Sequence, residues 1–260
     1  MKEPGAGPEI EIREASYAGR NRDGAAVTVG PITFKINGGE FFSILGPDDE
    51  NRGMLLRLIA GLDFPASGKV LVSGTDVVSA QQNVGFVFKE PSLLEWQTVF
   101  QNVLLPCEVR RLNRLQCEAQ ARRLLIAMGV AGYADRKPAG LSVGLAQRVS
   151  VCRALAHSPS LLLLDNPFHN LSGLDREQMA TDLQRLWLTP RMTVVLGTTQ
   201  IAEAVHLSDR VAVMAPDGRI LQTISIDLPR PRRMDKATTP RIAEYCNSIR
   251  TVFHAGGMLT

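Results

Sequence analysis

Residues 42–56, FSILGPDDENRGMLL, have the outline of a phosphate-binding loop. An apolar run ends at Leu45, a turn opens with Gly46 and Pro47, and a helical run is predicted from Met54. A loop of the G-x-x-x-x-G-K-[ST] type uses glycines to close backbone N–H groups on phosphates, a lysine to meet the β- and γ-phosphates, and a hydroxyl to hold Mg²⁺. The spacing therefore suggests a nucleotide as the ligand.

The residues that should perform this chemistry are replaced. Asn51 stands at the second glycine, Arg52 at the lysine and Gly53 at the hydroxyl. Three carboxylates lie where an anion should bind, those of Asp48, Asp49 and Glu50. A carboxylate about 4 Å from a phosphate oxygen repels it by roughly 4 kcal/mol at an effective dielectric constant of 20. That is about half of the ~8 kcal/mol that binds a micromolar ligand, so we expect phosphate binding to be weakened severely.

Two other arrangements of residues 48–52 remain open. In the first, Arg52 pairs with Asp48 or Asp165 and fills the space that a nucleotide would occupy. In the second, the four oxygen-bearing side chains from Asp48 to Asn51 hold a divalent cation, since hard cations prefer such ligands. Contiguous side chains rarely all point inward, so the salt-bridged cap is favoured over the cation site.

The composition is that of an ordinary soluble globular chain, with 260 residues, 45% hydrophobic and 21% charged. A net charge of +3, with no basic stripe and interleaved aromatics, gives no reason to expect a nucleic-acid partner. The N-terminal residues MKEPGAGPEI contain no apolar signal core, and no run approaches the roughly 20 apolar residues of a membrane span. We expect a cytosolic protein whose membrane role, if any, comes through a partner.

The cysteines and histidines show no metal-ligand spacing, so no metal site is expected from them and the cysteines are interpreted as free, mostly buried thiols. They are Cys107, Cys117, Cys152 and Cys246, with His157, His169, His206 and His254.

The elements that must position the loop alternate between strand and helix. Residues 9–16 and 26–36 alternate apolar and polar side chains, which predicts half-buried antiparallel strands. Residues 40–45 predict a strand, 54–62 a helix, and 69–72 and 83–88 further strands. From Lys89 the period becomes helical, with helices expected at 99–109, at 114–128 and, after the N-cap residue Ser142, to His157.

The run from Leu161 to Leu164, closed by Asp165, is typical of a strand buried on both faces of a parallel sheet. Helices are expected at 175–188 and 201–207, and strands at 192–197 and 211–214. The sequence LPRPRR from Leu228 predicts a basic extended linker, followed by a C-terminal helix at 239–253. This alternation favours an α/β fold with a mostly parallel sheet, interrupted by a helical insert of about seventy residues.

Five stretches together resemble the ATP-binding subunit of an ABC transporter, of the nitrate, sulfonate and taurine importer type. They are VGFVFKEPSLLEWQTVFQNVLLP from Val84, LSVGLAQRVSVCRALAHSP from Leu141, LLLLDNPF from Leu161, LSDRVAVM from Leu207, and the LPRPR tail. The likeness covers about residues 9–235. It implies a P-loop NTPase (ABC ATPase) fold with N-terminal antiparallel strands and an inserted helical subdomain.

The resemblance also implies a domain plan. Residues 8–88 and 158–226 would form a discontinuous RecA-like ATPase core, residues 89–157 a helical signature subdomain, and residues 227–260 a C-terminal tail. It implies ATP and Mg²⁺ as ligands, although binding by this chain is in doubt. A permease in the membrane, a second ATP-binding subunit and, indirectly, a solute-binding protein are the implied partners, with the chain peripheral to the inner face of the cell membrane.

The departures from the family are as systematic as the likeness. Lys89 stands where the family has a glutamine that contacts Mg²⁺ and the attacking water. Asn166 replaces the glutamate that acts as general base, Ser172 replaces an aspartate, and Thr199 replaces the switch histidine. An amide can orient a water but cannot accept its proton at neutral pH, so slow or absent hydrolysis is expected.

The other nucleotide contacts carried over are weak or vestigial: Tyr17 against adenine, Gly46, Arg52 and Gly53 in the loop, Asp165 beside Mg²⁺, and Ser142 and Gly144 in the signature LSVGL. A tyrosine at a strand end more often packs against its neighbours than binds a ligand, so packing is the favoured interpretation of Tyr17. No residue is assigned a catalytic role.

The substitutions affect the two halves of a nucleotide site, the phosphate loop and the signature segment, to different degrees. Cassettes of this family pair head to tail, so that one subunit's phosphate loop meets the other's signature. Ser142 and Gly144 keep a hydroxyl and an N–H at the start of a helix, although Val143 adds bulk beside them. We therefore predict pairing with an intact paralogue, most of the ATPase activity being the paralogue's. The alternatives are a non-transport scaffold that keeps only the fold, and a working ATPase with atypical residues.

Overall fold

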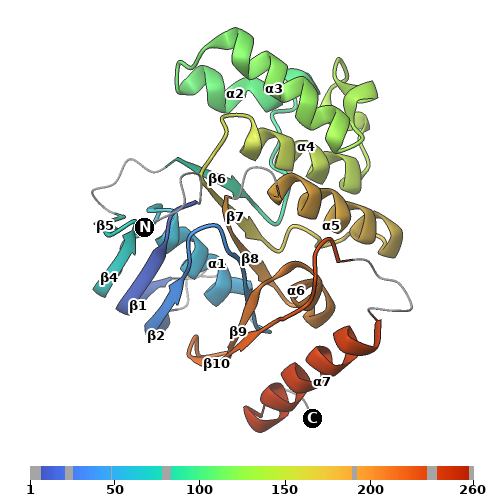
Figure 1. Cartoon of the computed structure of the whole chain (residues 1–260). Helices are drawn as coiled ribbons and strands as arrows, with labels where there is room; N and C mark the ends of the chain where they lie inside the picture. The colour runs from blue at the N-terminus through green and yellow to red at the C-terminus, as the bar shows by residue number, and fades with distance from the viewer. Residues whose placement is uncertain are drawn as a thin grey trace. The chain divides into compact units, whose positions relative to one another are not determined.

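The computed structural model describes residues 7–20, 26–47, 49–77, 83–188, 192–232 and 239–257. The chain divides into two compact units. The first combines residues 1–82 with residues 191–260, and the second is the continuous segment 83–190. Figure 1 shows both units, with labels on most of their helices and strands.

The first unit contains an antiparallel sheet. Its strands lie in the order β2 (Ala26–Ile36), β1 (Ile10–Arg20), β4 (Ser67–Val72) and β5 (Thr75–Asp76). In β1, Ile10 pairs with Ile36 on one side and Val72 on the other, and all three are buried. The antiparallel strands expected from the alternation of apolar and polar residues are confirmed.

A second set of strands in this unit carries the turn of interest. Strand β3 (Phe41–Leu45) lies between β8 (Thr193–Thr198) and β9 (Arg210–Met214), parallel to both, and β10 (Ile220–Ser225) pairs antiparallel with β9. Every residue of β3 and β8 is buried. This explains their mostly apolar sequences, because strands of a parallel sheet are covered on both faces.

The helix after β3 begins earlier than its apolar period predicts. Helix α1 runs over Asp49–Ile59, whereas the sequence suggested a start at Met54 and an end near Gly61. Asp49 and Glu50 stand in its first turn, where negative residues favour the positive end of the helix dipole. Five residues interpreted as loop, Asp49 to Gly53, are therefore helical.

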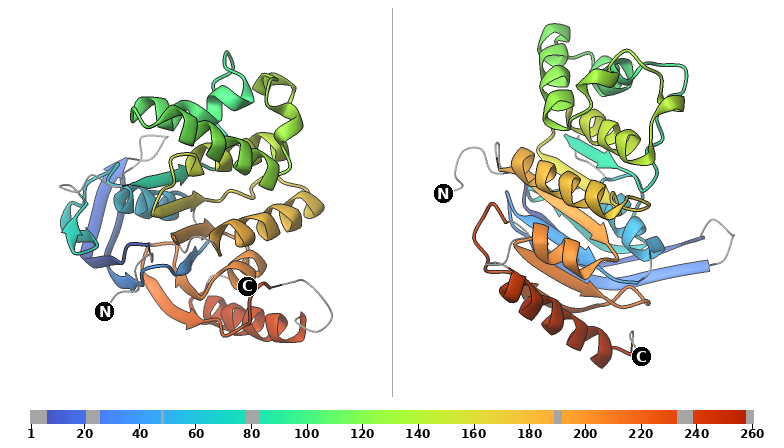
Figure 2. Two further views of the ribbon diagram at one scale, coloured as in Figure 1. Left: turned by 45° about the horizontal axis from the view of Figure 1, so that its top comes forward. Right: turned by 90° about the vertical axis from the view of Figure 1, so that its right-hand side faces the viewer.

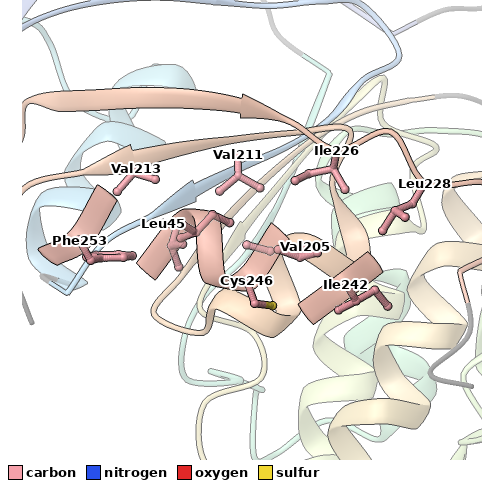
Figure 3. Packing of buried hydrophobic residues seen from close by; sticks show 11 residues of the cluster. Leu45, Val205, Val211, Val213, Ile226, Leu228, Ile242, Cys246 and Phe253 are labelled. Atoms are coloured by element: carbon pink, nitrogen blue, oxygen red, sulfur yellow. The ribbon is translucent and has the colours of Figure 1, made fainter. Parts of the chain in front are cut away.

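The C-terminal helix α7 (Thr239–Ala255) covers an apolar face of the first unit, as Figure 3 shows. Ile242, Cys246, Ile249 and Phe253 recur at helical spacing and pack in one cluster with residues of β3, α6 (Ile201–Leu207) and β9. Leu45 belongs to this cluster, one residue before the turn at Gly46. The helix expected at 239–253 is confirmed.

In the segment interpreted as a basic extended linker, two arginines bind backbone carbonyls of the first unit; we call Arg230 and Arg232 the clasp. Arg232 is 3% exposed and donates to the carbonyls of Val205 at 2.8 Å, Ser208 at 2.6 Å and Ile226 at 3.0 Å. Arg230 donates to the carbonyl of Leu207 at 2.6 Å. Cations here satisfy carbonyls that the end of α6 leaves without helical partners, a role that a count of charges in the sequence does not reveal.

The clasp makes stability depend on pH through His206. Burial, Arg232 and Arg230 lower the pKa of His206 to about 4, against about 6.5 in an unfolded chain. The unfolded state binds the proton first, so the stability is fully present above pH 6.5 and is lost as pH falls toward 4. We expect a loss of about 2 kcal/mol between pH 7.5 and pH 5 from this group.

Urea unfolding at the two pH values measures this loss. His206→Gln should show a smaller pH dependence than the natural chain, and His254→Gln, a change at an exposed histidine of α7, should not. An unchanged pH dependence in His206→Gln would remove His206 as the cause.

The second unit is a pair of parallel strands with helices. Strand β6 (Val84–Val87) pairs with β7 (Leu161–Asp165). The helices are α2 (Val99–Val109), α3 (Arg114–Ala127), α4 (Val143–Leu155) and α5 (Gly173–Trp187), with 3₁₀ turns at Ala131–Tyr133 and Pro138–Gly140. Figures 1 and 2 show α2, α3 and α4 lying together. The helices expected in this part of the chain are confirmed, each within two residues at either end.

Local signals fix these helix starts. Thr98 and Gln101 form a reciprocal capping box at α2, and Ser142 caps α4 as predicted. Buried Arg148 of α4 donates to Asp182 of α5 at 2.7 Å, which ties the two helices together. No helix within the described ranges combines the length and the apolar character needed to cross a bilayer.

Candidate functional site: a phosphate loop occupied by arginine

The site residues predicted from the sequence fall on both units. Tyr17, the turn after β3 and Thr199 belong to the first unit. Lys89, the start of α4, the end of β7 and Ser172 belong to the second.

Arg52 is buried and binds the backbone of the turn after β3. Its side chain is completely buried, and its Nη1 donates to the carbonyl of Gly46, where the turn begins. A lysine at this position in a phosphate loop would offer its charge to the ligand. Arg52 instead directs an N–H at the loop's own backbone, as part of helix α1. The predicted pairing of Arg52 with Asp48 or Asp165 stays a prediction, since Asp48 lies outside the described residues; a backbone carbonyl is one partner of the guanidinium.

The neighbours of Arg52 are also fixed by the fold. Asn51 is 4% exposed, and its Nδ2 donates to the carbonyl of Pro216 at 2.5 Å. Gly46 lies so close to β9 that an added Cβ would be 2.7 Å from the carbonyl oxygen of Met214. Gly53 is buried in the first turns of α1 and offers no hydroxyl.

The expected cluster of carboxylates is only partly described. Glu50 is exposed in the first turn of α1, whereas Asp48 and the side chain of Asp49 lie outside the described residues. The suggested cation site therefore falls partly outside the described residues. Among those that are described, no group of three or more His, Cys, Asp or Glu residues could hold a metal ion.

Tyr17 packs along its own strand. An added Cβ on Gly19 would lie 2.4 Å from the Tyr17 hydroxyl and 2.5 Å from its ring, so the ring lies directly over Gly19. The side chain is half-buried in β1. A glycine two residues beyond an aromatic makes room for the ring on the same face of the strand.

Thr198 holds the end of β8. Thr198 is buried, donates to Glu203 Oε2 at 2.5 Å and accepts from the Gln200 N–H at 3.0 Å. Thr199, predicted at the switch position, is half-buried beside it. Its hydroxyl cannot supply the charge of an imidazolium.

In the second unit, β7 ends at half-buried Asp165 and is followed by buried Asn166. The backbone of Asn166 has φ of 44°, in the left-handed region that asparagine tolerates better than most residues. Its carbonyl accepts from the His169 N–H at 3.0 Å, which turns the chain away from the strand. Lys89, at the end of a different strand of this unit, is half-buried.

The signature segment keeps its frame. Ser142 Oγ accepts from the Leu145 N–H at 3.3 Å, so this hydroxyl caps α4. Val143 is 49% exposed, and Gly144 stands in the first turn. The amino end of a helix favours anions through its oriented N–H groups.

A carboxylate already lies at that end of α4. An added Cβ on Gly144 would be 3.4 Å from Asp175 Oδ2. Asp175 also accepts from Ser172 Oγ at 2.8 Å and donates its N–H back to that hydroxyl at 3.2 Å, so Ser172 caps α5. Sequence reasoning missed Asp175, although the S-x-x-D pattern from Ser172 is a capping signal that could have located it.

These residues do not fit MgATP as ligand. The cation of the loop is buried against the loop's own carbonyl, the Mg²⁺-binding hydroxyl is absent at Gly53, and a carboxylate lies beside Gly144. No hydrolytic step can be derived from this set.

The comparisons with known proteins agree on one family. The family model described as ABC transporter matches residues 29–169. An uncharacterized ABC transporter ATP-binding protein of Methanocaldococcus jannaschii is 37% identical over 219 residues, which cover 84% of this chain and 81% of that protein. The aliphatic sulfonates import ATP-binding protein SsuB of Escherichia coli K12 is 36% identical over 218 residues, 84% of this chain and 82% of SsuB.

Solved structures confirm the predicted α/β fold. The dimeric structure of MJ0796, a bacterial ABC transporter cassette, superposes with a TM-score of 0.75 at 25% identity and covers 85% of this chain and all of that one. A dimeric post-hydrolysis state of the same cassette, bound to ADP and Pi, gives 0.75 at 24% identity with the same coverage. At that identity the second likeness speaks for the fold alone.

Proposed function

Because this chain belongs to the ABC transporter family, we propose that it is the ATP-binding subunit of an importer whose own nucleotide site has lost its activity. The observation that carries the proposal is the buried Arg52, whose guanidinium is bound to the carbonyl of Gly46. An arginine held in this way blocks the closure of the loop's N–H groups on a phosphate, and its planar fork does not replace a compact ammonium group.

The proposal includes an asymmetric dimer. The relatives of known structure are dimers, and each site of a head-to-tail pair would join one loop to one signature. The loop half from this chain is the more altered. The signature half keeps Ser142 and Gly144 at the amino end of α4, although Asp175 places a negative charge beside Gly144. An intact paralogue would then perform most of the hydrolysis.

Permease docking is proposed for the second unit. A hollow of about 460 Å³ opens there, lined by Pro91, Leu93, Leu141 and Val143, with Glu90 and Glu95 among its polar residues. A hollow that combines apolar side chains with carboxylates suits a short helix from a membrane partner. Docking would hold the chain at the inner face of the membrane, with residues 89–157 as the helical subdomain and 227–260 as the tail.

We expect the purified chain to release no more phosphate from ATP than its Asp165→Ala variant, because no residue in the described sites replaces the general base. Turnover at the rate of an ordinary cassette, lost on Asp165→Ala, would show instead a working ATPase with atypical residues.

Affinity purification of the tagged chain from its own cells distinguishes the proposed importer subunit from the remaining alternative, a non-transport scaffold. We expect an intact homologous cassette and a permease to be recovered together with the chain. Recovery of soluble partners without a permease would favour the scaffold.

A further inference from the structure

The turn between α2 and α3 presents apolar and basic side chains together. We call residues 109–115, VRRLNRL, the hairpin tip. Three of its side chains are exposed although apolar: Val109 at 74%, Leu112 at 43% and Leu115 at 79%. Single exposed apolar residues need no explanation, whereas three within seven residues concentrate apolar surface at one turn.

The charge of the hairpin tip is one-sided. Its three charged residues are the exposed arginines Arg110, Arg111 and Arg114, so these seven residues carry as much positive charge as the whole chain has in net terms. Glu118 pairs with Arg114 at 2.8 Å and Glu108 precedes the tip, which reduces the local excess without reversing it.

The tip is held in its exposed shape by its own backbone. The N–H groups of Arg110, Arg111 and Leu112 donate to carbonyls of α2, at 3.2, 3.0 and 3.0 Å. Asn113 caps α3, with its Oδ1 accepting from the Gln116 N–H at 3.1 Å. The turn therefore cannot fold its apolar side chains inward without breaking these bonds.

We propose that the hairpin tip binds the surface of an anionic phospholipid bilayer. Such a surface offers both complements at once, since its headgroups attract arginine and its acyl boundary receives apolar side chains at shallow depth. The contact is separate from the proposed permease docking, because it uses only the tip and requires neither nucleotide nor a protein partner.

Sedimentation of the full chain with vesicles tests the proposal. We expect the chain to bind vesicles of phosphatidylcholine mixed with phosphatidylglycerol, and not vesicles of phosphatidylcholine alone, with binding weakened by added salt. Each basic charge contributes about 1 kcal/mol near such a surface, or about fivefold in affinity. Arg111→Glu changes two charge units and should weaken binding about twenty-fivefold. Leu115→Ser should weaken it about tenfold.

Matched variants serve as controls. Leu174 is also 79% exposed and is also the second residue of its helix, so Leu174→Ser is the counterpart of Leu115→Ser. Arg250→Glu reverses an exposed charge on α7. Both should bind as the natural chain does. Equal loss in tip and control variants, equal binding to uncharged vesicles, or no binding to anionic vesicles would each overturn the proposal, the last favouring an acidic protein as the partner of the tip.

Discussion

A chain in which residues 48–53 are changed from DDENRG to SGSGKS will bind MgATP at least about 100-fold more tightly than the natural chain, a gain of about 2.7 kcal/mol. The change removes three carboxylates, each of which can repel a nearby phosphate by several kcal/mol. It also replaces Arg52, whose buried guanidinium is bound to Gly46, with a lysine, and restores the hydroxyl at position 53. Isothermal titration calorimetry with MgATP measures the gain.

The control must match the change in charge. Glu14→Ser, Glu108→Ser and Glu177→Ser together remove three exposed carboxylates elsewhere and should leave ATP affinity as it is. If the natural chain already binds ATP tightly, or if the control gains as much as the restored loop, the loop is not what limits nucleotide binding.

Arg232→Ala will lower the free energy of unfolding by about 4 kcal/mol, in the range expected when one partner of a buried charged network is removed. The guanidinium donates to several backbone carbonyls around the end of α6, and its side chain is almost fully buried. Truncation leaves those carbonyls buried without their donor, and each such loss costs about 1–3 kcal/mol.

Urea unfolding followed by far-ultraviolet circular dichroism measures the loss. Tryptophan fluorescence monitors the unfolding of the second unit separately, because both tryptophans, Trp96 and Trp187, lie there. Arg232 lies in the first unit. Arg250→Ala, at an exposed site of α7, should cost less than about 0.5 kcal/mol. A similar small cost for Arg232→Ala would mean that water can replace the clasp.

Much of the fold follows from local signals. The strand at 161–165 was predicted from five consecutive residues because burial on both faces leaves no polar alternation to obscure the run. The helix at 99–109 was predicted to the residue from its apolar period, and the capping box of Thr98 and Gln101 explains why it starts there. The family followed from the order and spacing of five stretches, none of them intact.

Most of the residues that sequence reasoning missed make contacts with segments that are distant in the sequence. Nothing local to Arg232 indicates that the carbonyls of Val205 and Ser208 lie within reach, because those contacts join segments more than twenty residues apart. The early start of α1 was missed because its first turn has no apolar period, and because the glycine at position 53 lowers the helix propensity of the segment. Asp175 was missed because its neighbour Gly144 is distant in sequence.

The contact of Arg52 with Gly46 has a consequence for how this loop responds to solution conditions. Arg52 and Gly46 belong to one short segment. The guanidinium is therefore present near the loop at an effective concentration set by the chain and not by the solution. A free ligand stabilises a protein in proportion to the logarithm of its concentration over its dissociation constant, whereas a tethered one gives a constant contribution. On the proposed function, the loop is therefore expected to stay in one state whether ATP is abundant or depleted, and the chain to be as stable without nucleotide as with it.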